Sequence, residues 1–94
     1  MAKLLENKNQ LKIIQMNWKE YVGCTGKWSL CDLCGEAVSE EDGYYIALID
    51  SWYCKTCLEA YLKGAKRYKS DMEKEQKNFV NMKTKLVDMG VWEN

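Results

Sequence analysis

Two cysteine pairs organise this sequence: Cys31-Asp32-Leu33-Cys34, then nineteen residues, then Cys54-Lys55-Thr56-Cys57. Two intervening residues let both sulfurs of a pair reach one ion, and two such pairs complete a tetrahedral shell of four sulfurs. A separation of about 15–20 residues between the pairs is typical of zinc sites. We therefore predict one structural Zn²⁺ bound by Cys31, Cys34, Cys54 and Cys57. Iron is the other metal that suits such a shell.

The residues between and after the pairs indicate a β-hairpin followed by a helix. Gly35 stands where the chain must turn behind the first pair, a turn that glycine makes without steric cost. Residues 44–49 are aromatic and β-branched, as is typical of a strand, and Asp50-Ser51 suits a turn. After Cys57 the apolar residues fall on one helical face. The sequence thus predicts a zinc knuckle and β-hairpin over residues 23–57, followed by a helix whose first turn supplies the last two ligands.

This order of knuckle, hairpin and helix resembles the treble-clef class of zinc fingers over about residues 28–66, with ligand spacing similar to GATA-type and DksA/TraR-type fingers. The four cysteines named above take the ligand positions in that resemblance. It implies a transcription-regulatory or nucleic-acid-associated protein. Two features depart from those families: here the long helix follows the finger instead of preceding it, and the hairpin is acidic instead of basic.

The chain has 94 residues, with 14 basic and 14 acidic side chains, so we expect a single small domain with no general attraction to polyanions. Its charge is unevenly placed. Residues 31–57 have a net charge of −5, whereas residues 1–30 carry +3 and residues 58–94 carry +2. Because nucleic-acid affinity comes from cations that neutralise phosphates, nucleic-acid binding through the acidic finger is disfavoured. One basic cluster remains as the candidate for that alternative role: Lys63, Lys66, Arg67 and Lys69. The competing interpretation is a solvated helix face.

Residues 58–94 carry a seven-residue apolar repeat typical of a coiled coil or helix bundle. Glu75 is the one exception among ten repeat positions, and Gly90 is placed as a C-terminal cap. Gly64 and a capping-box pattern after Ser70 favour a second possibility, two helices that meet near residue 70. The repeat predicts a partner-binding surface, for an unknown protein or a second copy, at Met72, Phe79, Met82, Leu86 and Met89.

Residues 1–22 carry a partial version of the same repeat, interrupted at Asn7. This pattern predicts an N-terminal helix, which could lie on the C-terminal one and cover its apolar stripe. The expected fold class is therefore small α+β: a zinc-bound finger flanked by an N-terminal helix and a long C-terminal helix.

Cysteine usage and the early charges of the N-terminus favour a reducing, cytoplasmic compartment, and no apolar run is long enough to span a membrane. The fifth cysteine, Cys24, has no histidine to activate it and is interpreted as a bystander thiol. A four-cysteine shell has no open coordination position, so we expect neither an enzyme nor a small-molecule substrate. The function expected is a non-catalytic zinc module with a helical surface for protein–protein interaction or self-association.

Overall fold

The hairpin predicted between the cysteine pairs is present in the computed structural model, which describes residues 1–65 and 68–93. Strand β3, Gly43–Ile46, pairs antiparallel with β4, Ser51–Tyr53, so that Tyr45 lies opposite Trp52. Asp50 closes the turn between them with a φ of 50°, a left-handed conformation that aspartate tolerates better than most residues. The hairpin is confirmed, but the first strand ends at Ile46 instead of residue 49, and Ser51, predicted in the turn, begins β4.

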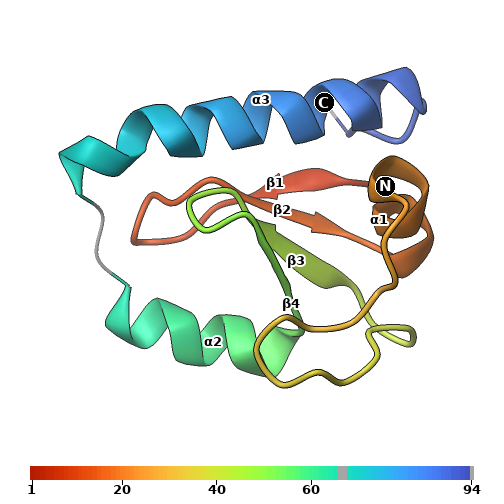
Figure 1. Ribbon diagram of the computed structural model, residues 1–94, viewed down its shortest axis with the longest axis horizontal. Coiled ribbons are helices and arrows are strands. Elements are labelled where there is room, and N and C mark those ends of the chain that lie inside the picture. Colours follow the sequence, from red (N-terminus) through yellow and green to blue (C-terminus); the bar gives the residue numbers. More distant parts are fainter. Residues whose placement is uncertain (66–67, 94) are drawn as a thin grey trace.

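The predicted N-terminal helix over residues 1–22 is wrong, because residues 3–16 form two strands and the loop that joins them, and only the last five residues of the segment are helical. Strand β1, Lys3–Leu5, pairs with β2, Ile13–Met16, and β2 pairs with β3, giving an antiparallel sheet in the order β1-β2-β3-β4 (Figure 1). Asn7 organises the connecting loop: its Oδ1 accepts from the Leu11 backbone N–H, and its Nδ2 donates to the Leu5 and Leu11 carbonyls. Such local side-chain bonds favour a turn over a helix.

Helix α1, Trp18–Thr25, is the only helical part of the N-terminal third in the residues that the structure describes. It begins at a capping box in which Asn17 and Glu20 each accept a hydrogen bond from the other's backbone N–H. It ends at Gly26, whose φ of 70° is the left-handed conformation that glycine adopts without cost.

The C-terminal segment forms two helices instead of one, which agrees with the second prediction, that of two helices meeting near residue 70. Helix α2 is Lys55–Gly64, and a short 3₁₀ turn, η1, Lys69–Asp71, leads into α3, Met72–Asp88. The end of α3 matches the prediction for Gly90: the Gly90 N–H donates to the Val87 carbonyl and the Val91 N–H to the Leu86 carbonyl. This pair of bonds is the Schellman motif.

The apolar stripe of α3 packs on the chain's own sheet, along which the helix lies in Figure 1. Of the five residues predicted to bind a partner, Phe79, Met82 and Leu86 are buried, whereas Met72 and Met89 are exposed. Glu75, the exception in the repeat, is also buried, and its Oε2 accepts a hydrogen bond from the Lys12 backbone N–H. The repeat therefore marks an intramolecular contact of α3 with the sheet and with α1, where the Met82 sulfur lies 3.3 Å from the Cys24 Sγ. Its single carboxylate ties α3 to the end of the β1–β2 loop.

Helices cover both faces of the sheet, and successive residues of a strand point to opposite faces. On one face the Trp52 ring stacks on Tyr21 of α1, with ring centroids 4.1 Å apart. On the other face Tyr53 meets Tyr61 of α2 edge to face at 5.9 Å. The short strand β4 is thus held from both sides, and Cys54 follows it directly.

Trp52 is the largest side chain with no exposed surface. Its Nε1–H donates to the Ser29 hydroxyl at 3.1 Å. Gly43 faces the ring so closely that a Cβ at this position would overlap its six-membered part. Glycine is required here by the approach of the ring and not by its backbone conformation.

The two ends of the sheet-and-helix unit meet in a short backbone pairing. The Ala2 N–H donates to the Val91 carbonyl at 2.8 Å, and the Glu93 N–H donates to the Ala2 carbonyl at 2.7 Å. Ala2 is fully buried. The segment that follows α3 is thereby fixed beside the first strand.

Alkaline pH is expected to destabilise the fold because burial raises the pKa of several tyrosines, namely Tyr21, Tyr44, Tyr45, Tyr53 and Tyr61. These tyrosines stay protonated in the folded chain while the unfolded chain ionises near the ordinary value of 10.0. Their contribution to stability is therefore complete below pH 10 and is lost as the pH rises, by up to about 1.4 kcal/mol per pH unit for each group. Urea unfolding between about pH 8 and pH 11 measures this loss.

Tyr45→Phe provides the control for the alkaline loss. Burial and the 2.6 Å hydrogen bond to Asp50 both raise the pKa of Tyr45, so the variant is expected to lose stability less steeply above pH 10. A free energy of unfolding that stays constant up to about pH 11 in the parent chain would contradict the prediction.

Across residues 1–65 and 68–93, no helix combines the length and the apolar character that crossing a bilayer requires.

Candidate metal centre

The structure brings together the four cysteines that the sequence selects. The Sγ atoms of Cys31, Cys34, Cys54 and Cys57 all lie within 4.8 Å of one another. The Cys34 and Cys54 sulfurs are 3.9 Å apart, and none of the four cysteines is in a disulfide. A four-cysteine cluster with metal-binding geometry is therefore part of the fold.

The first pair lies on a tight knuckle before the hairpin. The Gly35 N–H donates to the Cys31 carbonyl at 2.8 Å, and Gly35 has a φ of 77°, which confirms the turn predicted there. The Cys31 N–H donates to the Glu36 carbonyl, so the chain returns beside itself immediately after the second sulfur. Cys31 is buried and Cys34 is exposed, which leaves the cluster open to solvent on the Cys34 side.

The second pair lies at the beginning of α2. Cys54 is the N-cap residue of this helix, with the extended backbone typical of that position, and Cys57 lies in its first turn. The Leu58 N–H donates to the Cys54 carbonyl at 2.9 Å, which closes the turn. Because a strand ends and a helix begins at Cys54, both sulfurs are presented from rigid elements toward the knuckle.

Asp32 joins the cysteine knuckle to the core, a role that cysteine spacing did not reveal. The Asp32 N–H donates to the Trp52 carbonyl and the Asp32 carboxylate accepts from the Trp52 N–H, both at 2.8 Å. This reciprocal pair satisfies the backbone of β4 on its outer edge. An aspartate inside a C-x-x-C motif next to a strand is the only sequence signal that could have suggested it.

The sulfur geometry fits a tetrahedral ion. With metal–sulfur bonds of about 2.3 Å, the edge of a regular four-sulfur tetrahedron is about 3.8 Å. The Cys34–Cys54 separation of 3.9 Å matches this edge, and the remaining separations, up to 4.8 Å, require only small movements of the side chains. The donor set is entirely sulfur, which suits zinc or iron and not magnesium or calcium.

The electrostatics of the cluster favour thiolate at one position and oppose it at another. Burial raises the pKa of the Cys31 thiol, but hydrogen bonds from backbone N–H groups outweigh burial and bring this pKa down to about 7. The donors belong to Cys34, Cys54 and Leu33. Burial and the neighbouring sulfurs raise the pKa of Cys57. Four adjacent thiolates repel one another, and a bound cation is what allows all four to lose their protons.

Comparison with known proteins adds nothing to this geometry. No family model, no curated protein and no solved structure matches the chain. The resemblance to treble-clef fingers therefore rests on the ligand spacing and on the order of elements alone.

Cys24 lies apart from the cluster, on α1. Its Sγ is 3.3 Å from the Met82 sulfur and 3.5 Å from the Tyr21 carbonyl oxygen. Burial raises its pKa, which disfavours the reactive thiolate. These surroundings support the interpretation of Cys24 as a bystander thiol.

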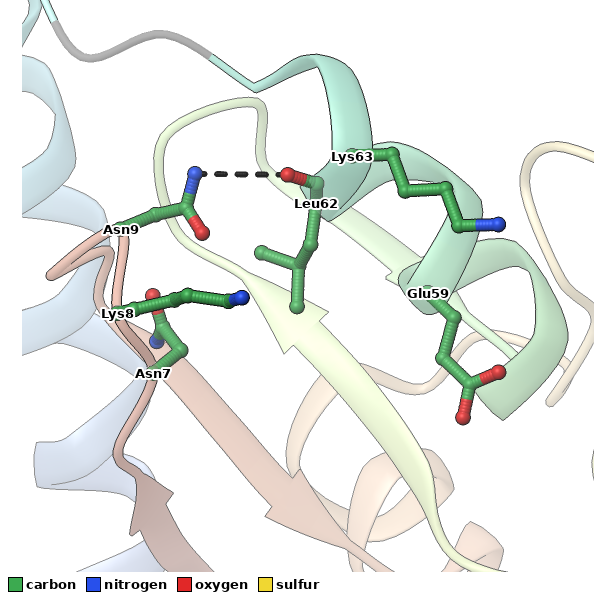
Figure 2. Close-up of a pocket in the computed structure, with 6 residues that line it drawn as sticks. All are labelled: Asn7, Lys8, Asn9, Glu59, Leu62 and Lys63. Carbon is green, nitrogen blue, oxygen red and sulfur yellow. Dashed lines mark hydrogen bonds between the residues drawn. The ribbon is translucent and has the colours of Figure 1, made fainter.

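The residues suggested for nucleic-acid binding are only partly placed. Lys63 and Lys69 are exposed, whereas Lys66 and Arg67 lie outside the described residues. Lys63 lines an open cleft of about 610 Å³ between the β1–β2 loop and α2. Figure 2 shows Asn7, Lys8 and Asn9 on one wall and Glu59, Leu62 and Lys63 on the other, with the Asn9 amide donating to the Leu62 carbonyl. The cleft contains both charge signs and none of the four cysteines.

Proposed function

We propose that the chain is a non-catalytic zinc-binding module that acts through protein–protein interaction. One Zn²⁺, held by Cys31, Cys34, Cys54 and Cys57, would fix the knuckle to the start of α2. The observation that carries this proposal is the convergence of four sulfurs, from two rigid elements, at the spacing of a tetrahedral shell. Four protein ligands leave no position for water or substrate, which supports a structural and not a catalytic metal.

Phe79, Met82 and Leu86 of the predicted partner surface are in the core, and Met72 and Met89 are exposed, so the α3 stripe as a whole gives the interaction role little support. Exposed apolar residues outside this stripe are better candidates for a partner surface. The alternative, a nucleic-acid-associated protein, has one supporting observation: Lys8 and Lys63 line the same cleft. Glu59 lies in that cleft too, and the finger is acidic, so we place this alternative second.

Cobalt substitution tests the proposed site. Protein loaded with one Co²⁺ is expected to show the intense charge-transfer absorption of a tetrahedral four-thiolate site, which Zn²⁺ then displaces. Because the shell is closed, added azide or imidazole is expected to leave the spectrum unchanged. A spectrum that shifts on addition of either ligand would reveal an open position and contradict the non-catalytic proposal. Salt-dependent binding of labelled duplex or single-stranded nucleic acid would favour the alternative.

A further inference from the structure

An apolar pocket lies between α1 and the two segments that flank the knuckle, residues 28–30 and 37–39. A cavity of about 230 Å³ is lined almost wholly by apolar side chains, from Trp18, Val22, Trp28, Leu30, Ala37 and Val38. The Trp28 side chain is 87% exposed and that of Leu30 is 47% exposed. A large aromatic ring left in water is uncommon in a small domain, and contiguous exposed apolar surface marks an interaction site.

The walls of this pocket are fixed by backbone pairing next to the metal site. The Val38 N–H donates to the Ser29 carbonyl, and the Ser29 hydroxyl donates to the Val38 carbonyl. Leu30 and Ala37 form an antiparallel bridge, and the next residue along is the ligand Cys31. The pocket is therefore preorganised by the same knuckle that positions the first cysteine pair.

An acidic cleft lies on the other side of residues 37–39. These residues also line a second cavity of about 310 Å³, together with Glu40, Glu41, Asp42, Cys54 and Lys55. Among the described residues, Glu40 and Glu41 are exposed and in no ion pair. Four thiolates around one dication add two more negative charges beside this cleft. One short segment thus separates an apolar pocket from a cavity lined by three carboxylates and one lysine.

We propose that this double surface, the Trp28 pocket with the Glu40–Glu41 cleft, binds an extended peptide segment of a partner protein that carries an apolar anchor residue next to Lys or Arg. The anchor would enter the pocket against Trp28, and the cation would lie beside the two carboxylates. Both cavities are lined by residues 37–39, and an extended peptide advances about 3.3 Å per residue, so anchor and cation are expected within about four residues of each other. The inference rests on the proposed function, because the metal holds the knuckle that forms both cavities.

Charge favours a basic peptide over a second copy of the chain, a nucleic acid or an anionic lipid surface. A symmetric dimer through the same surface would bring the acidic loops of two copies together, which is repulsive. Nucleic acids and anionic lipid surfaces are repelled by the same carboxylates. A basic peptide is attracted, and its apolar anchor covers the exposed ring.

The test is selection from a random peptide display library on the immobilised, zinc-loaded chain. Enriched peptides are expected to share an apolar residue with Lys or Arg within about four positions. The most enriched peptide is then synthesised with a fluorescent label, and its Kd is measured by anisotropy. Trp28→Ala and the double variant Glu40→Lys/Glu41→Lys are each expected to weaken binding by about tenfold or more. Binding is expected to weaken further as salt rises.

Two matched substitutions on α3 serve as controls. Val87→Ala removes an exposed apolar side chain and Glu73→Lys reverses an exposed charge, both away from the knuckle. Each is expected to change the Kd by less than about twofold. Metal content and near-ultraviolet circular dichroism are measured for every variant. If the parent chain does not retain zinc, the proposed function is overturned. If it retains zinc but binds no peptide, only the proposed docking surface is overturned.

Three results would overturn the proposal. The first is enrichment of acidic or purely apolar peptides, or no enrichment at all. The second is a Kd that Trp28→Ala and the double charge reversal leave unchanged. The third is a dimer of the parent chain in sedimentation equilibrium that Trp28→Ala dissociates, because the occupant would then be a second copy.

Discussion

Cys54→Ser is expected to unfold the whole chain at room temperature. Binding of a structural zinc supplies an apparent 10–16 kcal/mol or so in small zinc-finger peptides, which equals or exceeds the total stability of a small domain. Cys54 is both a member of the sulfur cluster and the N-cap of α2. The unfolding should extend beyond the finger, because β3 and β4 are half of the sheet and β3 pairs with β2. Circular dichroism together with metal analysis measures the effect, and a strong chelator should reproduce it.

Cys24→Ala is the control for the cysteine substitution. This thiol is outside the cluster, so the variant is expected to keep its metal and lose only about 1 kcal/mol from the contact with Met82. A Cys54→Ser chain that melts cooperatively, with a native near-ultraviolet spectrum and no metal, would show that the fold does not depend on the site.

Trp52→Ala is expected to lower the free energy of unfolding by about 3–5 kcal/mol. The ring has no exposed surface, it stacks on Tyr21, and its Nε1–H donates to Ser29. Truncation leaves a cavity between the sheet and α1 and leaves the Ser29 hydroxyl without this donor. Urea unfolding at a fixed excess of zinc measures the loss, because metal binding otherwise changes the apparent stability.

Trp28→Ala is the matched control for Trp52→Ala. It removes the same side chain from a position that is 87% exposed, and its expected effect on stability is within about 0.5 kcal/mol. Similar losses for the two variants would contradict the assignment of Trp52 as the core tryptophan.

The four-cysteine cluster was predictable because its information is local in the sequence. Two sulfurs separated by two residues converge in almost any tight turn or helix start, and the spacing between the pairs suits one hairpin. Gly35 and Gly90 were predictable for a similar reason, since each occupies a left-handed turn position that follows directly from its neighbours.

The strands at the N-terminus were not predicted because a seven-residue apolar repeat over a short segment does not distinguish a helix from two strands and a loop. Leu4 and Ile14 are repeat members, and in the structure they are cross-strand partners in β1 and β2. The two polar interruptions of the repeats carried the missing information. Asn7 organises the loop between these strands, and Glu75 accepts the Lys12 N–H at its end. The interruptions mark where the chain leaves one periodic element and contacts another.

The backbone pairing of Ala2 with Val91 and Glu93 has a practical consequence for experiments in solution. One fluorophore attached near Ala2 and another near Val91 would lie within a few nanometres of each other, where resonance energy transfer is efficient. The two would separate when α3 leaves the sheet. Such a doubly labelled molecule could report release of the last helix independently of the optical signals that follow the cysteine cluster.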